Sequence, residues 1–585
     1  NNRKGFLHMK KKLLPALIVT GLIILVVIIM GITALINKYT PTKKTEDLKE
    51  YFNISSDDEA ALIVDNELSD YKAKIIDKKI YVDYKFVHDS LNSRFYWDAN
   101  ENVLLYTTAS DIISAAADSN SYSVTKQTND FGYPIVKATS DSALIALDYV
   151  KQYSNITFKS YDDPARIVIT SKWDEIDSAT VSKSTQVRVK GGIKSPILKE
   201  VKKDDKITIL DSGDKWDKVA TEDGVIGYIK RKALSESKKT KLTNPDYEEE
   251  TFTHIKKDKD ICLAWNQVTS QSANSKVPQV ISSTKGINVM SPTWFYLNDN
   301  NGNLADIASK DYVSYCHSQG IEVWGLFSNL ENTDVDAAYV LTHTSTRTTL
   351  INQIMSAAFN YELDGVNIDF ENITEAAYGD SYIEFIRELA IKCHNNGISL
   401  SVDVTVPASF NKFFNRSDMA NFADYIVIMG YDEHYKGSDA GSVSSIPWVT
   451  EGVESTLKEV PADQIILGMP FYTRIWELTP KEDDDAVTDT EDQSKYTVAS
   501  QVYSMDAAAA QLATNNATAA LDEESGQNYA EWSVSNKLYK VWLEDTTSLE
   551  KRLKLVDDNK LAGAAFWKLG FENSSVWDTV IKYLD

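Results

Sequence analysis

The stretch that decides the fold of the C-terminal half is Asp364-Gly365-Val366-Asn367-Ile368-Asp369-Phe370-Glu371. Because side chains alternate between the two faces of a β-strand, Asn367, Asp369 and Glu371 share one face, and the apolar residues between them share the other. Carboxylates at the carboxyl end of a strand are typical of the active-site end of a parallel (β/α)8 barrel. The stretch therefore predicts one strand of a barrel whose polar face is turned inward.

Apolar runs on both sides of this stretch alternate with amphipathic segments, which is the pattern of βαβ units. They predict eight parallel strands in about 325 residues, which fits a TIM barrel with insertions. The gap between strands seven and eight, about residues 477–541, predicts a small insertion that starts with a loop at 481–492. The expected strands are Ile261–Trp265, Ile287–Ser291, Glu322–Phe327, Gly365–Phe370, Ser399–Val404, Tyr425–Met429, Ile465–Met469 and Ala562–Trp567.

The carboxylates Asp369 and Glu371 lie two residues apart on one face of the expected strand. Their charges repel, so one of them is expected to hold a proton near neutral pH. A protonated carboxyl group is what general acid catalysis requires. The sequence thus predicts a general acid at the open end of the barrel.

Four motifs, each at the end of an expected strand, resemble glycoside hydrolase family 18. They are the D-x-x-D-x-D-x-E pattern at 364–371, Met429-Gly430-Tyr431-Asp432, the run at 468–474, and Ala562-Gly563-Ala564-Ala565-Phe566-Trp567. The resemblance covers about residues 259–585 and is strongest to the spore-cortex and peptidoglycan-directed N-acetylglucosaminidases.

This resemblance implies substrate-assisted retaining hydrolysis, which differs from the two-carboxylate scheme of most glycosidases. Glu371 would protonate the glycosidic oxygen, and the 2-acetamido oxygen of the sugar would attack the anomeric carbon. Asp369 would orient the acetamido N–H and stabilise the oxazolinium ion, and Tyr431 would donate its hydroxyl to the acetamido oxygen. This chemistry implies no metal and no cofactor.

The same resemblance suggests substrate-binding residues around the acid. Trp567 would form an apolar floor under the sugar, and Asp432 would position the substrate or Tyr431. Trp294, which follows the second expected strand, is a candidate for stacking on a sugar. The remaining candidates are Met429, Tyr472 and Arg474.

One position departs from the family pattern, because Asn367 stands where the family has its middle aspartate. An asparagine amide can donate a hydrogen bond to Asp369, but it cannot exchange a proton. A shifted pH optimum is therefore expected, with activity retained.

The N-terminus carries an almost wholly apolar run at residues 13–36, long enough to cross about 30 Å of hydrocarbon. Arg3, Lys4 and the three lysines at 10–12 precede it. By the positive-inside rule we expect residues 1–37 to form a cytoplasmic tail and single transmembrane helix, with the rest outside the cell. A cleaved signal peptide is the alternative, although the run is longer than a normal signal and lacks a clear cleavage site.

A linker at residues 38–58 is expected to lead into an α+β stalk domain at 59–174. Two strand–helix–strand copies occur there, each ending in a hairpin, at 96–106 and 158–169. The segment resembles the copper amine oxidase N-terminal-like domain of Gram-positive cell-surface proteins, but it offers no copper ligands, so a spacer or weak wall-binding role is expected.

Short β-runs at residues 184–236 predict a small β-barrel. They are similar to a bacterial Src-homology-3-like domain, which implies possible contact with peptidoglycan peptides. Trp216 is expected to fill the core of this barrel. A charged linker at 237–258 precedes the catalytic barrel at 259–585.

Composition excludes some classes of function. The net charge of −24 argues against nucleic-acid binding, which depends on cationic residues. Three cysteines without a CxxC pair and seven histidines suggest neither a disulfide framework nor a metal site. The sequence therefore predicts a membrane-anchored surface glycosidase acting on N-acetylglucosamine-containing glycan, with peptidoglycan as the expected substrate. A chitinase-like hydrolase and a non-catalytic cell-wall glycan-binding protein remain as alternatives.

Overall fold

The structure is a computed structural model that describes residues 2–373, 378–481 and 492–584. Its contacts divide the chain into two compact units. One contains residues 1–93 and 135–249, and the other contains residues 94–134 and 250–585. A segment from the first half of the sequence therefore belongs to the C-terminal unit. The loop expected at 481–492 lies almost wholly outside the described residues.

Helix α1 (Asn2–Tyr39) begins the first unit. From Pro15 to Tyr39 its 25 residues have a mean hydropathy of 2.9. By length and composition this part could cross about 30 Å of hydrocarbon. A signal sequence would have the same properties, so the helix alone does not separate an anchor from a signal.

The first sheet of this unit has seven strands in the order β11-β12-β1-β2-β3-β10-β9. β1 pairs in parallel with β12, and the other neighbours are antiparallel. The hairpin expected at 158–169 is present as β11 and β12. The elements are β1 (Glu59–Val64), β2 (Glu67–Ile76), β3 (Lys79–Asp83), α3 (Tyr84–Ser90), β9 (Val136–Ala138), β10 (Ala143–Ala146), α4 (Leu147–Gln152), β11 (Thr157–Tyr161) and β12 (Arg166–Thr170).

The second sheet also has seven strands, in the order β15-β14-β18-β17-β16-β13-β19. β14, β16, β17 and β18 match runs expected from the sequence, whereas β13, β15 and β19 were not expected. The strands are β13 (Glu175–Thr180), β14 (Thr185–Arg188), β15 (Ile197–Val201), β16 (Lys206–Asp211), β17 (Trp216–Thr221), β18 (Ile226–Lys230) and β19 (Lys238–Lys241).

Trp216 does not fill the core of this sheet, contrary to expectation. Asp217 and Val219 are buried on one face of β17, and alternation places Trp216 on the other face, half-buried and outside the apolar cluster. The Lys230 ammonium lies 5.6 Å from the centre of its ring. Trp216 thus lies near the surface.

In the second unit, eight parallel strands close into a barrel in the order β20-β21-β23-β24-β25-β26-β27-β33, and β33 pairs again with β20. Short β22 (Leu304–Asp306) adds antiparallel to β21. All eight expected strands are present. They are β20 (Ile261–Asn266), β21 (Val289–Leu297), β23 (Glu322–Ser328), β24 (Gly365–Asp369), β25 (Ser399–Thr405), β26 (Tyr425–Met429), β27 (Ile465–Pro470) and β33 (Gly563–Trp567).

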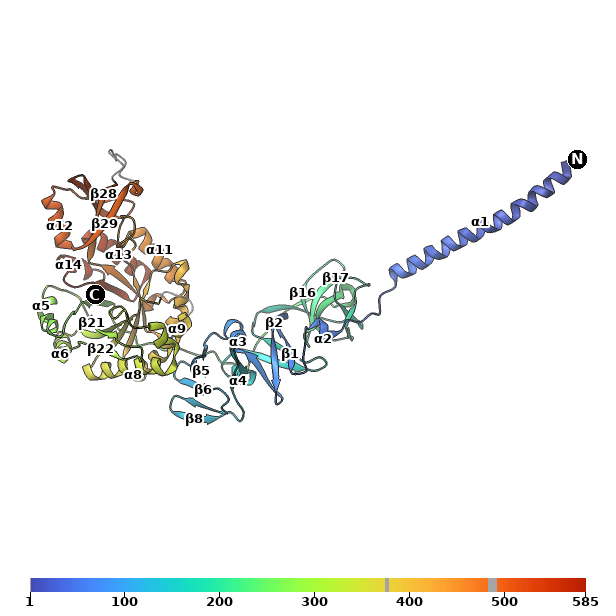
Figure 1. Ribbon diagram of the computed structural model, residues 1–585, viewed down its shortest axis with the longest axis horizontal. Coiled ribbons are helices and arrows are strands. Elements are labelled where there is room, and N and C mark those ends of the chain that lie inside the picture. The colour runs from blue at the N-terminus through green and yellow to red at the C-terminus, as the bar shows by residue number, and fades with distance from the viewer. Residues whose placement is uncertain (1, 374–377, 482–491, 585) are drawn as a thin grey trace. The chain divides into compact units, whose positions relative to one another are not determined.

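Helices surround this barrel, as Figure 1 shows for α8, α9, α11 and α13. The apolar side chains form one cluster inside the barrel and a larger one between the strands and the helices. α9 is buried along most of its length. The helices are α5 (Val277–Val280), α6 (Lys310–Ser318), α7 (Ala337–Thr342), α8 (Thr344–Tyr361), α9 (Gly379–His394), α10 (Arg416–Phe422), α11 (Ile446–Thr456), α13 (Thr546–Asn559) and α14 (Val576–Val580).

The insertion expected between strands seven and eight is a five-stranded antiparallel sheet in the order β29-β28-β32-β31-β30, with helix α12 (Met505–Thr514). β28 follows directly on β27, so the insertion starts earlier than expected, at Tyr472. Its strands are β28 (Tyr472–Pro480), β29 (Tyr496–Ser504), β30 (Ala520–Asp522), β31 (Gln527–Val534) and β32 (Lys537–Leu543).

Residues 94–134 form a second antiparallel sheet of five strands, which packs on the barrel helices. The Tyr96 hydroxyl lies 2.8 Å from the hydroxyl of Ser381 on α9. Thr107 donates to Glu384 one turn further along the same helix, at 2.9 Å. The expected stalk domain at 59–174 is thus interrupted by a segment of the catalytic unit. The strands of the sheet at 94–134 are β4 (Phe95–Asp98), β5 (Val103–Thr107), β6 (Ile112–Ala116), β7 (Ser121–Val124) and β8 (Gln127–Asp130).

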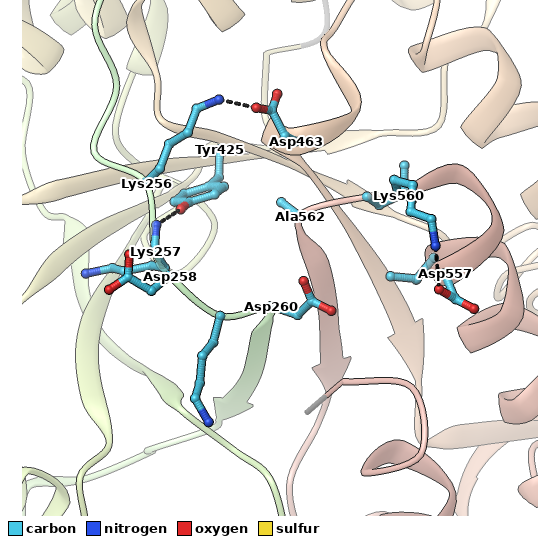
Figure 2. Close-up of a pocket in the computed structure, with 12 residues that line it drawn as sticks. Lys256, Lys257, Asp258, Asp260, Tyr425, Asp463, Asp557, Lys560 and Ala562 are labelled. Atoms are coloured by element: carbon cyan, nitrogen blue, oxygen red, sulfur yellow. Dashed lines mark hydrogen bonds and ion pairs between the residues drawn. The ribbon is translucent and has the colours of Figure 1, made fainter.

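The amino ends of the barrel strands surround a cavity of about 300 Å³ (Figure 2). Lys256 pairs with Asp463, and Lys560 pairs with Asp557 at 2.9 Å. The backbone N–H of Lys257 donates to the Tyr425 hydroxyl at 3.0 Å. Because TIM-barrel active sites lie at the opposite face, this end is assigned to stability.

Candidate active site

Asn367 lies inside the barrel and uses its whole amide group. Its carbonyl oxygen accepts from the Trp265 indole at 3.0 Å and from the Ser291 hydroxyl at 3.1 Å. Its amide nitrogen donates to Ser401 at 3.0 Å and to Asp403 at 2.7 Å. The expected hydrogen bond from this amide to Asp369 is therefore wrong, because both N–H groups are directed to the neighbouring strand β25.

Asp369 ends β24 on the inward face, two residues beyond Asn367. The residue is 9% exposed, and its buried Oδ1 has no hydrogen-bond partner among the described residues. Burial and the charges of Asp403, Glu371 and Glu331 raise the pKa of this carboxyl well above its ordinary value. An unpartnered buried oxygen is costly, so it is available to a ligand.

Glu371 lies just beyond the end of β24, and part of its side chain reaches solvent. The surrounding protein and the charges of Asp432 and Glu331 raise the pKa of its carboxyl. No cation among the described residues lowers this pKa. The structure thus places a carboxyl with a raised pKa at the open end of the barrel, within reach of a substrate.

Three aromatic side chains line this end of the barrel. Trp265 makes edge contacts with Tyr431 and Trp567, with ring centres 6.4 Å and 5.9 Å apart. Burial and the charges of the nearby carboxylates raise the pKa of Tyr431 well above its ordinary value, so its hydroxyl remains a donor. Trp567 is half-buried and packs on the inner cluster, which leaves part of the indole open.

Asp432 follows Tyr431 in a left-handed conformation, with φ 61°. Its exposed carboxyl group accepts a hydrogen bond from the Tyr472 hydroxyl and lies 4.0 Å from Arg474. Asp tolerates this conformation better than bulky residues. Asp432 on the loop after β26 therefore lies close to Tyr472 and Arg474 on β28, and all three were expected from the sequence.

Two other expected residues have different outcomes. Trp294 is wholly buried, and its indole donates to Asn274 at 2.8 Å. β21 continues to Leu297, so alternation places Trp294 on the helix-facing side with Met290, and the expectation of sugar stacking is wrong. Met429 ends β26 and is 8% exposed, so its contact with substrate stays a prediction.

Sequence reasoning missed Asp403, Trp265 and Asn329. Asp403 is the third inward position in the alternation Ser399, Ser401, Asp403 on β25, and this polar face was the available signal. Asn329 follows β23, and its buried side-chain nitrogen has no partner among the described residues. No sequence pattern would have identified Asn329, since its burial depends on the loop after β24.

In the described part of the chain, no group of three or more His, Cys, Asp or Glu side chains is arranged to hold a metal ion. Cys262, Cys316 and Cys393 are buried and free. Asp364, at the entry to β24, accepts from the Val323 N–H and bonds His317, which is a structural role.

The family described as Glycosyl hydrolases family 18 matches residues 332–572. This segment therefore resembles a family 18 domain. It includes five of the eight barrel strands, among them the strand that ends in Asp369. It also includes Glu371 and Tyr431, so the matched residues hold the centre of the site.

Two curated relatives agree with this match. An "Uncharacterized glycosylase YvbX" of Bacillus subtilis (strain 168) is 24% identical over 302 residues, which cover 48% of this chain and 81% of the relative. The "Cortical fragment-lytic enzyme" of the same strain is 24% identical over 287 residues, covering 47% of this chain and 63% of that enzyme. The barrel is therefore a glycoside hydrolase domain.

Part of the chain is also similar to solved structures. The spore cortex-lytic enzyme SleL of Bacillus megaterium QM B1551 has 19% sequence identity and a TM-score of 0.48, covering 59% of this chain and 77% of that chain.

Proposed function

We propose that the family 18 domain hydrolyses β-linked N-acetylglucosamine-containing glycan, with peptidoglycan as its substrate, by substrate-assisted retaining catalysis. The observation that carries the proposal is the meeting of Glu371, Asp369 and Tyr431 at the open end of the barrel. The charged groups that act on the carboxyls there are acidic, and they raise the pKa of both carboxyls.

Glu371 acts as the general acid. It lies outside the packed interior, where a glycosidic oxygen can reach it, and the raised pKa of its carboxyl favours the protonated form that a general acid requires. After the leaving group departs, the same carboxylate accepts a proton from the incoming water. This exchange of roles requires no metal ion or cofactor.

Asp369 and Tyr431 act on the acetamido group. The free Oδ1 of Asp369 accepts from the acetamido N–H, which directs the carbonyl oxygen of the substrate towards the anomeric carbon. Tyr431 donates its hydroxyl to that oxygen. The resulting oxazolinium ion is positively charged, and the surrounding carboxylates stabilise it.

Trp567 forms the apolar floor of the subsite, because it packs on Trp265 and keeps part of its indole open. Asp432 holds Tyr472 and lies near Arg474, so these three residues and Met429 form the wall on the side of β26 and β28. Asn367 acts within the barrel by fixing Asp403.

We also propose that α1 anchors the enzyme in the cell membrane with its N-terminus in the cytoplasm and the catalytic unit outside. The support is the apolar span after Arg3, Lys4 and Lys10. The sheets at 59–170 and 175–241 would then serve as a stalk and as a possible contact with peptidoglycan. Protease added to intact cells should remove the barrel, and its protection until lysis would contradict this orientation.

The substrate is tested by digesting purified muropeptide glycan, chitin oligosaccharide and a fully deacetylated glycan, with products read by mass spectrometry. We expect turnover of the N-acetylated peptidoglycan and binding without turnover of the deacetylated chain. Faster cleavage of chitin would assign the chitinase-like alternative. Binding of all three without any cleavage would indicate a glycan-binding protein.

A further inference from the structure

The part of the chain that leaves α1, residues 40–46, is bound to the second sheet of the first unit. The Thr42 N–H donates to the Ile193 carbonyl oxygen at 2.8 Å, and the Glu46 N–H donates to the Ile197 carbonyl oxygen at 2.8 Å. A parallel bridge also joins this segment to the first residue of β15. The chain therefore attaches to the sheet at the turn between β14 and β15 as soon as it has left the helix.

Two basic side chains strengthen this attachment. The Lys194 ammonium, in the turn between β14 and β15, donates to the Thr40 carbonyl oxygen at 2.7 Å and to the Asn37 carbonyl oxygen at the end of α1. The buried Arg188 guanidinium, on β14, donates to the Thr42 carbonyl oxygen at 3.3 Å. The β14–β15 turn is thus fixed both to the last turn of the helix and to the residues that follow it.

The attachment lies close to the end of the helix. α1 ends at Tyr39, and three Cα–Cα steps lead from there to Thr42, so the two residues are at most about 11 Å apart. The apolar part of α1 has 25 residues, which corresponds to a length of about 37 Å. A bilayer has about 30 Å of hydrocarbon and a headgroup layer of about 5–8 Å on each side. A spanning α1 therefore brings the β14–β15 turn to the level of the headgroups.

This part of the unit carries an excess of positive charge. Residues 37–45 and 186–199 contain seven lysines and arginines and no aspartate or glutamate, although the whole chain has a net charge of −24. Arg188 is buried, and Lys199 pairs with Asp223 at 2.6 Å. The other five form no ion pair with a described residue and are exposed. We call them the basic collar, and they are Lys38, Lys43, Lys44, Lys190 and Lys194.

Tyr39 supports the position of the collar at a membrane surface. Its side chain is 67% exposed at the end of the apolar helix, and the Lys38 ammonium lies 5.8 Å from the centre of its ring. Tyrosine is enriched at the membrane–water interface, and lysines near the ends of spanning helices extend their ammonium groups to the same level. The end of α1 thus has the residue types of a helix that leaves the hydrocarbon here.

We propose that the basic collar binds the anionic phosphate headgroups of the outer membrane leaflet and seats the second sheet on the membrane. The inference rests on the proposed function, in which α1 is a membrane anchor with the catalytic unit outside. Each lysine near an anionic surface contributes about a fivefold preference for the bound state. A phosphate polymer of the wall has similar chemistry, but the short connection to α1 keeps the collar in the headgroup layer. The second sheet is then the foot of the stalk.

The test uses the full chain with a probe on the β14–β15 turn. Gly192→Cys adds a side chain that meets nothing within 4 Å, and Cys262, Cys316 and Cys393 are buried, so a nitroxide label reacts with the new thiol. The labelled chain is reconstituted into nanodiscs of phosphatidylcholine, or of phosphatidylcholine mixed with phosphatidylglycerol. Collisions with a water-soluble nickel chelate measure the exposure of the label to water. We expect fewer collisions in the anionic discs, and added salt should restore them.

Charge variants of the labelled chain identify the groups responsible. Lys43→Gln with Lys190→Gln removes two collar charges. At the salt concentration that leaves half of the parent label shielded in anionic discs, the ratio of shielded to open label should fall by about 25-fold, fivefold for each lysine. Lys202→Gln with Lys203→Gln makes the same change of charge at the other end of β15. This control should leave the label as it is in the parent.

Two results would overturn the inference. One is equal exposure of the label in neutral and anionic discs, and the other is equal shielding in the collar variant and its control. Shielding by soluble polyphosphate, but not by anionic lipid, would assign the collar to a phosphate polymer instead. Failure of the anchor gives a different result, because a chain that has lost α1 as a signal does not copurify with discs of either kind. That result would remove both the anchor and this inference, and the proposed catalysis would stand.

Discussion

The catalytic unit contains two buried groups of carboxylates, and they are built differently. On the helical side, Glu388 pairs with Arg347 at 2.8 Å, and Glu384 pairs with Arg387 at 3.0 Å. At the open end of the barrel, the pKa of Asp369 responds to burial and to other acids only. Glu384, Glu388 and Asp369 are all buried, so the difference between these carboxylates lies in the arginines.

This difference shows which carboxylates serve stability and which serve chemistry. Burial raises the pKa of Glu388 to about 7, with the nearby Arg347 opposing the rise. For Asp369 and Glu371, no cation among the described residues opposes the rise in pKa. An unpaired buried charge lowers stability, and an active site is where that cost is retained for function.

The largest expected effect is on stability, through the buried ion pair of Glu388 with Arg347. Arg347→Met should lower the free energy of unfolding by about 3–5 kcal/mol, because it leaves Glu388 buried without its cation. The folded-state pKa of Glu388 lies above its ordinary value of 4.5, so its contribution to stability is present at acid pH and is lost as pH rises through about 7. The loss in the variant should therefore be smallest at acid pH, as measured by urea unfolding.

A matched control breaks an exposed ion pair instead. Lys560→Met removes the pair with Asp557 at the amino end of the barrel, where both side chains are open to solvent. Such pairs contribute little, so no measurable change in Tm is expected. Equal losses in Lys560→Met and Arg347→Met would remove the distinction between buried and exposed pairs.

The second effect concerns the unpaired group. Glu371→Gln keeps the shape of the side chain but has no proton to donate, so kcat should fall by at least about 10²-fold. The unfolding curve should stay near that of the wild type, since no arginine loses its partner. A folded variant that retains full activity would show that the acid lies elsewhere.

The smallest effect sharpens the electrostatic argument. Glu331 raises the pKa of Glu371 through its charge, so Glu331→Gln should lower that pKa. Because the acid must be protonated, the alkaline limb of kcat against pH should move to lower pH by less than about one unit. An alkaline limb that stays in place or moves upward would mean that the charge of Glu331 does not raise the pKa of Glu371.

The fold of the barrel was predictable because its strands are short apolar runs with clear ends. The position of Glu371 followed from the alternation of one strand. Asp403 was missed because its significance depends on the neighbouring strand, where Asn367 turns towards it. The register between two strands depends on both of them, so it cannot be predicted from the sequence of either strand alone.

Two other outcomes have similar causes. The sequence prediction placed Trp294 in the cleft because it ended the second strand at Ser291. β21 continues to Leu297, and in this longer strand the indole of Trp294 faces the helices. The sheet at 94–134 could not be assigned to the catalytic unit, because its partners lie nearly 300 residues further along the chain. Tyr96 and Ser381, which are 285 residues apart, show this.

The central claim is that the acetamido group of the substrate is the nucleophile. The most direct measurement is proton NMR of the first product formed from a β-linked N-acetylated glycan, recorded before mutarotation. Two successive inversions at the anomeric carbon restore its configuration, so the account predicts an initial β-anomer and strong inhibition by a thiazoline analogue of the oxazolinium ion. An initial α-anomer would mean direct displacement by water and would contradict the account, even if Glu371 proved essential.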